Sequence, residues 1–155
     1  MNERIEWIFL ALRGTDYRVT SPSDRGYNCI AWAAADTREW WWPIEVATSR
    51  GYYWPAGVAR QENIEAFREA LATLGYVACN DDRLEVGYEK IALFALQGAP
   101  KHAARQLPNG RWTSKLGEGQ DIEHALHDLT GMVYGSVVLV MNRPLPMGDS
   151  EKRGS

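Results

Sequence analysis

The sequence has few cysteines, and neither they nor the histidines follow a metal-binding pattern. Only two cysteines occur in 155 residues, which is too few for a framework of disulfide bonds. There is no Cys-x-x-Cys pair, no His-Glu-x-x-His segment and no cluster of His and Cys at zinc-site spacing. We therefore expect two reduced thiols, no metal and no cofactor.

Long hydrophobic runs are also absent. The longest apolar stretch near the start, residues 8–12, is far shorter than the about 20 residues that cross a bilayer. Only Arg4 precedes it, where a signal peptide would carry a basic segment. We expect a cytoplasmic protein with no membrane partner, although export by a route without a cleavable signal is compatible with the same sequence.

The chain has no excess of positive charge. It carries 17 Lys and Arg against 20 Asp and Glu, a net charge of −3, and the basic residues are scattered. Because binding to a phosphate backbone depends on clustered positive charge, a nucleic acid is not an expected partner. The sequence does not indicate an oligomeric state.

The composition is that of a globular protein with many aromatic residues. Hydrophobic residues make up 45% and charged residues 24%, values close to those of soluble domains. The length predicts one domain over residues 1–145, followed by a flexible polar tail over residues 146–155. The chain has seven Trp and seven Tyr, and six of these fourteen form two clusters, at residues 40–42 and 52–54.

Helical spacing of apolar residues predicts helices in the first half of the chain. One covers residues 5–12, a second begins at about Asn28, and a third follows Asn63, a plausible N-cap. Apolar residues between Gly119 and Gly131 repeat the helical spacing and predict a further helical insertion.

Alternating and β-rich runs predict strands from residue 76 onward, at 76–79, 89–96, 102–107, 111–116 and 133–142. The turn sequence at residues 108–110 predicts that the strands on either side of it form a hairpin. The order of elements predicts an α+β fold, with N-terminal helices packed on a mostly antiparallel sheet.

Cys29 is a candidate nucleophile because it falls in the first turn of the second predicted helix. Unpaired backbone N–H groups and the helix dipole stabilise a thiolate there, so we expect a lowered pKa. The alternative is a small buried core residue, which is what most free cysteines are. Cys79 lacks this context, and we expect it in the core.

His102 is the candidate base, since it begins a predicted strand. If the hairpin forms, Ser114 lies close to His102 on the adjoining strand and orients its imidazole, with Thr113 and Asp121 as alternatives because the register is uncertain. We expect His124 and His127 to be solvated residues on the helical insertion.

This layout resembles the papain-like cysteine hydrolase superfamily, particularly its bacterial peptidases and amidases of the NlpC/P60 kind. The resemblance rests on cysteine at the head of a helix (residues 27–32), histidine at the start of a strand (residues 102–105) and a polar residue one strand later. Residues 27–43 and 102–117 also resemble a small bacterial family of undescribed function. The superfamily resemblance implies a papain-like core and thiolate attack on an amide or isopeptide carbonyl, with His102 protonating the leaving amine.

The aromatic residues are candidates for contact with a peptide-like or amide substrate, because aromatic side chains give a large contact area at little entropic cost. Core packing explains them equally well, but three consecutive Trp cannot all face inward, so at least one should be partly exposed. A non-catalytic binding module with an aromatic surface, and an acyltransferase on the same fold, remain alternatives to a hydrolase. The candidate substrate-binding residues are Trp32, Trp41, Trp42, Trp54 and Trp112.

Overall fold

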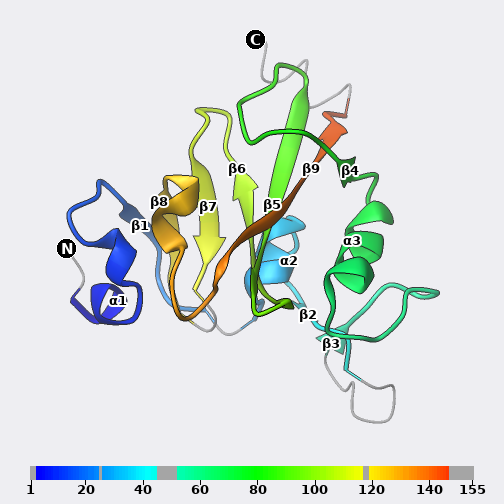
Figure 1. Ribbon diagram of the computed structural model, residues 1–155, viewed down its shortest axis with the longest axis horizontal. Coiled ribbons are helices and arrows are strands. Elements are labelled where there is room, and N and C mark those ends of the chain that lie inside the picture. Colours follow the sequence, from blue (N-terminus) through cyan, green and yellow to red (C-terminus); the bar gives the residue numbers. More distant parts are fainter. Residues whose placement is uncertain (1–2, 25, 45–51, 117–118, 147–155) are drawn as a thin grey trace.

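The computed structural model describes residues 3–24, 26–44, 52–116 and 119–146, which are arranged around one large sheet (Figure 1). Its seven strands are antiparallel throughout, in the order β1-β8-β7-β6-β5-β9-β4. A separate parallel pair joins β2 (Trp40–Trp41) to β3 (Tyr52–Tyr53). The strands of the large sheet are β1 (Arg18–Ser21), β4 (Val77–Ala78), β5 (Tyr88–Leu96), β6 (Ala99–Gln106), β7 (Trp112–Lys115), β8 (Asp121–His124) and β9 (Ser136–Pro144).

Helices cover both faces of this sheet, and the two-residue period of β5 separates the two cores. Ile91 and Leu93 pack with α2 and α3, whereas Ala92 and Phe94 pack with the helical segments of the other face. The first face carries α2 (Cys29–Ala33) and α3 (Ile64–Ala72), and the second carries α1 (Glu3–Ile8) and the 3-10 helices η1 (Leu10–Leu12) and η3 (Leu126–Leu129).

The predicted class of mixed helix and mostly antiparallel sheet is confirmed, as are the starts of two helices. Asn28 and Asn63 are N-caps, and their side chains accept hydrogen bonds from the backbone N–H of Ala31 (3.1 Å) and Ala66 (2.8 Å). Each cap satisfies an N–H group that the first helical turn leaves unpaired. The position of Cys29 at the head of α2 therefore follows from the residue before it.

The predicted hairpin between β6 and β7 is also confirmed. Arg105 pairs with Thr113 and Gln106 with Trp112, and the turn at residues 108–110 contains Gly110 with a φ of 88°. This pairing sets the relative positions of the side chains along β6 and β7.

The predicted helix between Gly119 and Gly131 is wrong in its first half. Residues 121–124 form β8, which pairs with β7 on one side and β1 on the other, and only residues 126–129 are helical, as η3. The apolar spacing at Ile122 and Leu126 suits one short helix as well as a strand followed by a turn. Pairing with a strand on each side decides in favour of β8.

The remaining predictions concern the termini and the membrane. The predicted polar tail lies outside the described residues from position 147 onward. In the part of the chain that the structure describes, every helix is too short or too polar to cross a bilayer.

Gly135 provides a test of how tightly the turn before β9 packs against β5. Its φ is +75°, and an added Cβ would lie 1.8 Å from the Ala95 carbonyl oxygen. We expect Gly135→Ala to destabilise the protein by about 3 kcal/mol or more, because β5 or the turn must move. Urea unfolding measures this loss.

Gly98 is the matched control. It has a φ of +83° with nothing within 4 Å of an added Cβ, so Gly98→Ala should cost only the backbone strain, about 1 kcal/mol. Equal losses for the two variants would contradict the close approach at Gly135.

Candidate active site

The predicted contact between His102 and Ser114 is present. The Nε2 atom of His102 lies 2.8 Å from the Ser114 Oγ, and both residues have 0% of their surface exposed. The contact follows from the β6–β7 register, which brings these two side chains together on one face of the sheet.

Sequence reasoning missed a third member of this cluster, His124. Its Nε2 lies 2.7 Å from the Ser114 Oγ and its Nδ1 lies 2.7 Å from the Ala125 carbonyl oxygen. It is a buried residue of β8, so its placement on a solvated helix was wrong. The alternation of Ile122 and His124 with acidic residues in this segment was the available signal for a strand.

Two aromatic rings hold the His102 imidazole in place. Tyr134 stacks on it with ring centroids 4.0 Å apart and an interplanar angle of 8°, and Phe94 meets it edge-on at 5.3 Å. The His102 Nδ1 is buried and has no hydrogen-bond partner among the described residues. An unpaired buried polar atom costs free energy, so this nitrogen requires an explanation.

Cys29 contacts β6 immediately on either side of His102. Its thiol donates to the Lys101 carbonyl at 3.9 Å, and its sulfur accepts from the backbone N–H groups of Ala103 and Ile30. The β6–β7 pairing covers only Arg105 and later residues, so the sulfur meets β6 before that pairing begins. Cys29 keeps 7% of its surface exposed.

A direct hydrogen bond between the thiol and the imidazole is not formed. Within the described residues, the His102 Nε2 is bonded to Ser114 and its Nδ1 to nothing, while the thiol proton faces the Lys101 carbonyl. The structure therefore brings the thiol to the backbone on either side of His102, while the imidazole packs on Phe94 and Tyr134.

The expected lowering of the Cys29 pKa is wrong. Burial raises the pKa of this thiol to about 11, and the backbone N–H groups at the sulfur offset only part of that effect. Burial also lowers the pKa of His102 well below its ordinary value, with the nearby His124 acting in the same direction. At neutral pH the thiol and the imidazole are therefore both uncharged.

The two alternatives to Ser114 have other partners. The Thr113 Oγ1 accepts a hydrogen bond from the Trp32 Nε1 at 2.9 Å. The Asp121 Oδ2 accepts from the Tyr27 hydroxyl at 2.8 Å and from Ser21. Ser114 is thus the residue of the three that contacts His102.

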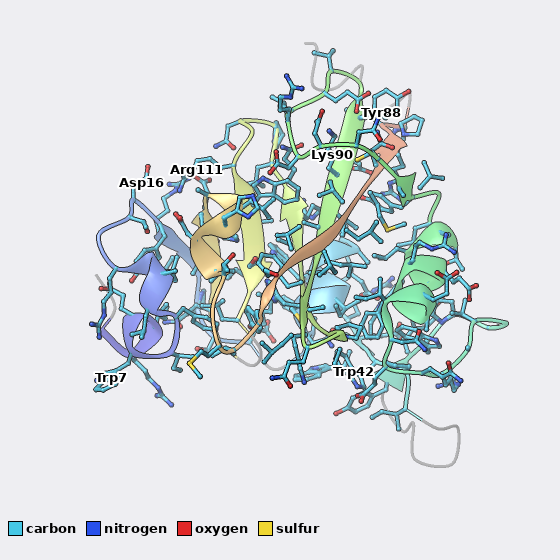
Figure 2. The ribbon with its side chains drawn as sticks, in the orientation of Figure 1. Trp7, Asp16, Trp42, Tyr88, Lys90 and Arg111 are labelled. Atoms are coloured by element: carbon cyan, nitrogen blue, oxygen red, sulfur yellow. The ribbon has the colours of Figure 1, made fainter. Side chains whose placement is uncertain are left out.

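Three of the five tryptophans predicted to bind substrate are core residues. Trp41, Trp54 and Trp112 retain 3–4% of their surface, so they do not offer a face to a substrate, and that prediction is corrected. Trp32 and Trp42 are partly exposed, as expected for at least one of the three consecutive tryptophans. Trp42 packs on Phe67 of α3 and lies in the lower part of the molecule in Figure 2.

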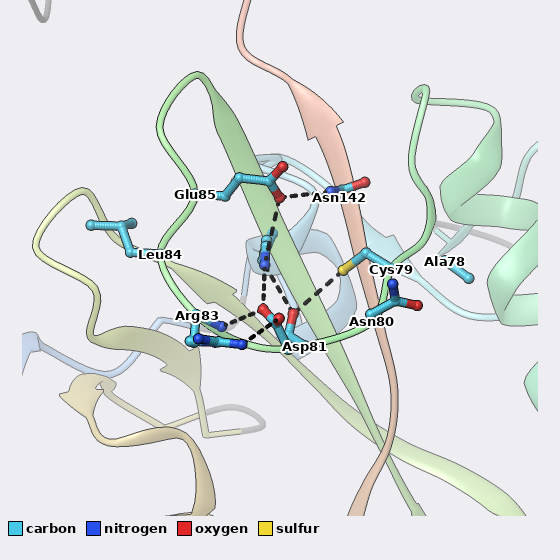
Figure 3. Close-up of a pocket in the computed structure, with 9 residues that line it drawn as sticks. Ala78, Cys79, Asn80, Asp81, Arg83, Leu84, Glu85 and Asn142 are labelled. Carbon is cyan, nitrogen blue, oxygen red and sulfur yellow. Dashed lines mark hydrogen bonds and ion pairs between the residues drawn. The ribbon is translucent and has the colours of Figure 1, made fainter.

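A polar pocket of about 560 Å³ lies elsewhere, beside β4 and the loop that precedes β5 (Figure 3). The Nζ of the buried Lys90 donates to the carbonyl and the carboxylate of Asp81 at 2.9 and 3.2 Å. The same Nζ lies 3.7 Å from the Glu85 Oε1. Cys79 lines this pocket and is half-exposed, which corrects its expected place in the core. None of the predicted site residues is among the lining residues.

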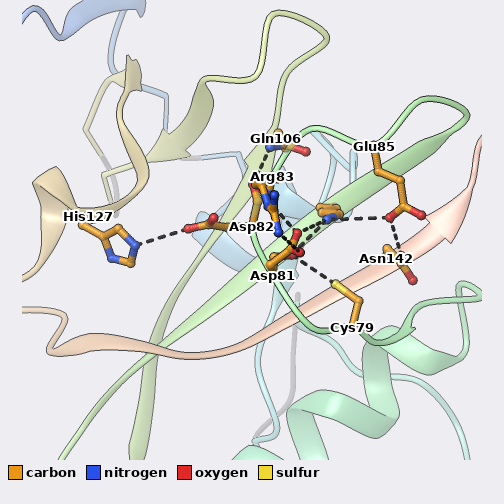
Figure 4. Close-up of polar contacts among 9 residues, drawn as sticks. Cys79, Asp81, Asp82, Arg83, Glu85, Gln106, His127 and Asn142 are labelled. Carbon is orange, nitrogen blue, oxygen red and sulfur yellow. Dashed lines mark hydrogen bonds and ion pairs between the residues drawn. The ribbon is translucent and has the colours of Figure 1, made fainter.

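Figure 4 shows the polar contacts that continue from this pocket toward η3. His127 lies 3.3 Å from the Asp82 carboxylate with 67% of its side chain exposed, so its predicted solvated position is confirmed. Across the described residues, no group of three or more His, Cys, Asp or Glu is arranged to hold a metal ion.

Comparison with known families places most of the chain in a described family. A family model described as "Domain of unknown function (DUF7689)" matches residues 18–142, which include Cys29, His102, Ser114 and His124. The chain belongs to this family. Neither the curated proteins nor the solved structures gave a match.

The buried histidines predict that stability falls in mild acid. Burial lowers the pKa of His124 to about 4 and that of His102 below its ordinary value, so the unfolded chain binds protons first as the pH falls below about 6.5. Stability should be complete above about pH 6.5 and decline by roughly 2 kcal/mol between pH 6.5 and 5 because of His124, and His102 should add to the decline in the same direction. Urea unfolding at several pH values measures the slope.

Two variants assign this slope to its source. His124→Gln should make the decline shallower, whereas His127→Gln, at an exposed position, should leave it unchanged. A decline that is the same in all three proteins would contradict the assignment.

Proposed function

We propose that this member of the family is a cysteine-dependent hydrolase that cleaves an amide or isopeptide bond of a peptide-like substrate. One observation carries the proposal. The thiol of Cys29 contacts the backbone on both sides of His102, whose imidazole is held at Nε2 by Ser114 and has an unpartnered Nδ1 among the described residues. A buried nitrogen with a free lone pair is suited to act as a general base, and the proposal assigns this role to the His102 Nδ1 because the Cys29 thiol contacts the backbone next to it in sequence.

A papain-like core of the NlpC/P60 kind is part of the proposal. The order of elements supports it, since a cysteine at the head of α2 packs against antiparallel β6, which carries His102, and β7 follows with Ser114. Residues of α2 share a core with Ala103 of β6, which holds the helix start against the strand.

The proposed reaction starts from two uncharged groups. As the Cys29 sulfur attacks the substrate carbonyl carbon, the thiol proton leaves the Lys101 carbonyl and moves to the His102 Nδ1. The carbon–nitrogen bond then breaks, and His102 returns the proton to the leaving amine. Water attacks the resulting thioester with His102 again as base, which releases the acid and restores the thiol.

The same backbone that surrounds the sulfur supplies hydrogen bonds for the negative charge that forms on the substrate. The N–H groups of Ala103 and Ile30 already approach the sulfur, and we assign them to the carbonyl oxygen of the tetrahedral intermediate. Fixed donors in a site with little water stabilise such an oxyanion strongly.

Trp32 is the predicted aromatic residue best placed to contact substrate. It is partly exposed and follows Cys29 by three residues in α2, so the two side chains lie on neighbouring positions of one helix face. The Arg105 guanidinium lies 5.2 Å from its ring centroid, which adds a positive charge to this side of the site.

Alkylation of the two cysteines with iodoacetamide tests the proposal. We expect Cys29 to be labelled at pH 7 faster than the half-exposed Cys79, because the His102 Nδ1 can accept the thiol proton during attack. His102→Ala should lower the Cys29 rate at least tenfold, in line with the loss of a general base. Peptide mass mapping after timed labelling gives both rates.

Cys79 serves as the internal control, since its rate should be the same in both proteins. A Cys29 rate that does not depend on His102 would contradict the proposal and favour the alternative in which Cys29 is a core residue of a binding module.

A further inference from the structure

The Ser114 hydroxyl lies between two buried imidazoles and has one hydrogen to donate. Its oxygen is 2.8 Å from the His102 Nε2 and 2.7 Å from the His124 Nε2. Ser114 must therefore donate to one ring and accept from the other. The direction decides which nitrogen of each ring carries a proton.

The Ala125 carbonyl sets this direction. A carbonyl oxygen only accepts hydrogen bonds, so the His124 Nδ1, 2.7 Å away, carries the hydrogen. Burial lowers the pKa of His124 to about 4, so the ring is neutral at pH 7 and its Nε2 is a bare lone pair. Ser114 consequently donates to the His124 Nε2.

The Ser114 oxygen must then accept its other hydrogen bond from the His102 Nε2. Because burial keeps His102 neutral as well, protonation at Nε2 leaves Nδ1 without a proton. The opposite direction would place two acceptors, the His124 Nδ1 and the Ala125 oxygen, 2.7 Å apart, or would require a charged histidine with 0% of its surface exposed.

We propose that His124 is a positioning residue which, through Ser114, fixes His102 in the tautomer whose Nδ1 is unprotonated, the form in which this nitrogen could serve as a base for Cys29. The consequence at Cys29 rests on the proposed hydrolase function, whereas the tautomer follows from the hydrogen bonds and from the neutrality of the two buried rings. Without the His124 acceptor, Ser114 is free to donate to the His102 Nε2, and the proton moves to Nδ1. That form of the imidazole has no lone pair for the thiol proton.

Nitrogen NMR of the ¹⁵N-histidine-labelled protein at pH 7 tests the tautomer, because protonated and unprotonated ring nitrogens have well-separated chemical shifts. In the unaltered protein the His102 Nδ1 should be unprotonated. In His124→Leu, which removes the acceptor, at least half of the His102 population should carry its proton at Nδ1.

Two further variants separate positioning from packing. His124→Gln offers an amide oxygen to the Ser114 hydroxyl and should restore the original tautomer. His127→Gln changes an exposed histidine of the neighbouring η3 and should have no effect. If His124→Leu does not fold, Ser114→Ala removes the bridge itself, so no hydrogen bond selects a tautomer and both forms of His102 should be populated.

Alkylation of Cys29 by iodoacetamide in the same proteins links the tautomer to the site. We expect the rate at pH 7 to fall at least tenfold in His124→Leu and to recover in His124→Gln. A His102 Nδ1 that is protonated in the unaltered protein, or a tautomer that His124→Leu leaves unchanged, would overturn the inference. A tautomer that shifts as expected while the Cys29 rate never depends on His102 would instead overturn the proposed hydrolase and leave the role of His124 in fixing the tautomer intact.

Discussion

Burial of neutral imidazole in the sheet interior is the constraint on which the rest of the site depends. His102 and His124 have no exposed surface, so each must stay uncharged and each ring nitrogen needs a partner or a reason to lack one. Three of the four nitrogens are bonded, through Ser114 and the Ala125 carbonyl. The fourth, the Nδ1 of His102, has no partner within the part of the chain that the structure describes, and packing alone does not explain this.

Several elements position the members of this chain of hydrogen bonds. The β7–β8 register brings Ser114 beside His124, and the turn from β8 into η3 presents the Ala125 carbonyl. The turn before β9 passes so close to β5 that Gly135 has no room for a side chain, and this approach brings Tyr134 over the His102 ring. The stacked Tyr134 ring limits rotation of the His102 imidazole. The hydrogen bond to Ser114 then determines which ring nitrogen carries the proton.

Features that depend on neighbouring residues, such as helix caps and a hairpin turn, were predicted correctly from the sequence. Features that depend on pairing between strands distant in sequence were not. Asn28 caps α2 from the adjacent position, and a short turn sets the hairpin that places His102 next to Ser114. His124 was missed because a four-residue segment has too few positions to distinguish a helix from a strand. Pairing with β1 and β7 makes this segment a strand. The predicted lowering of the Cys29 pKa was wrong for a related reason. A helix start lowers the pKa of a thiol locally, but burial in the surrounding core raises it more.

The tryptophans show the same limit of sequence-based prediction, because three of the five that were predicted to bind substrate are core residues. The indole N–H groups of Trp41 and Trp54 donate to Asp36 and to the Ala59 carbonyl, so these large rings are buried with their polar atoms satisfied. The aromatic excess is thus largely a means of packing the short α2 and the two-residue strands beside it. Trp32 differs, because its N–H bonds Thr113 of β7 while part of its ring stays exposed three residues after Cys29. Trp32 therefore combines packing against β7 with a ring that is partly exposed.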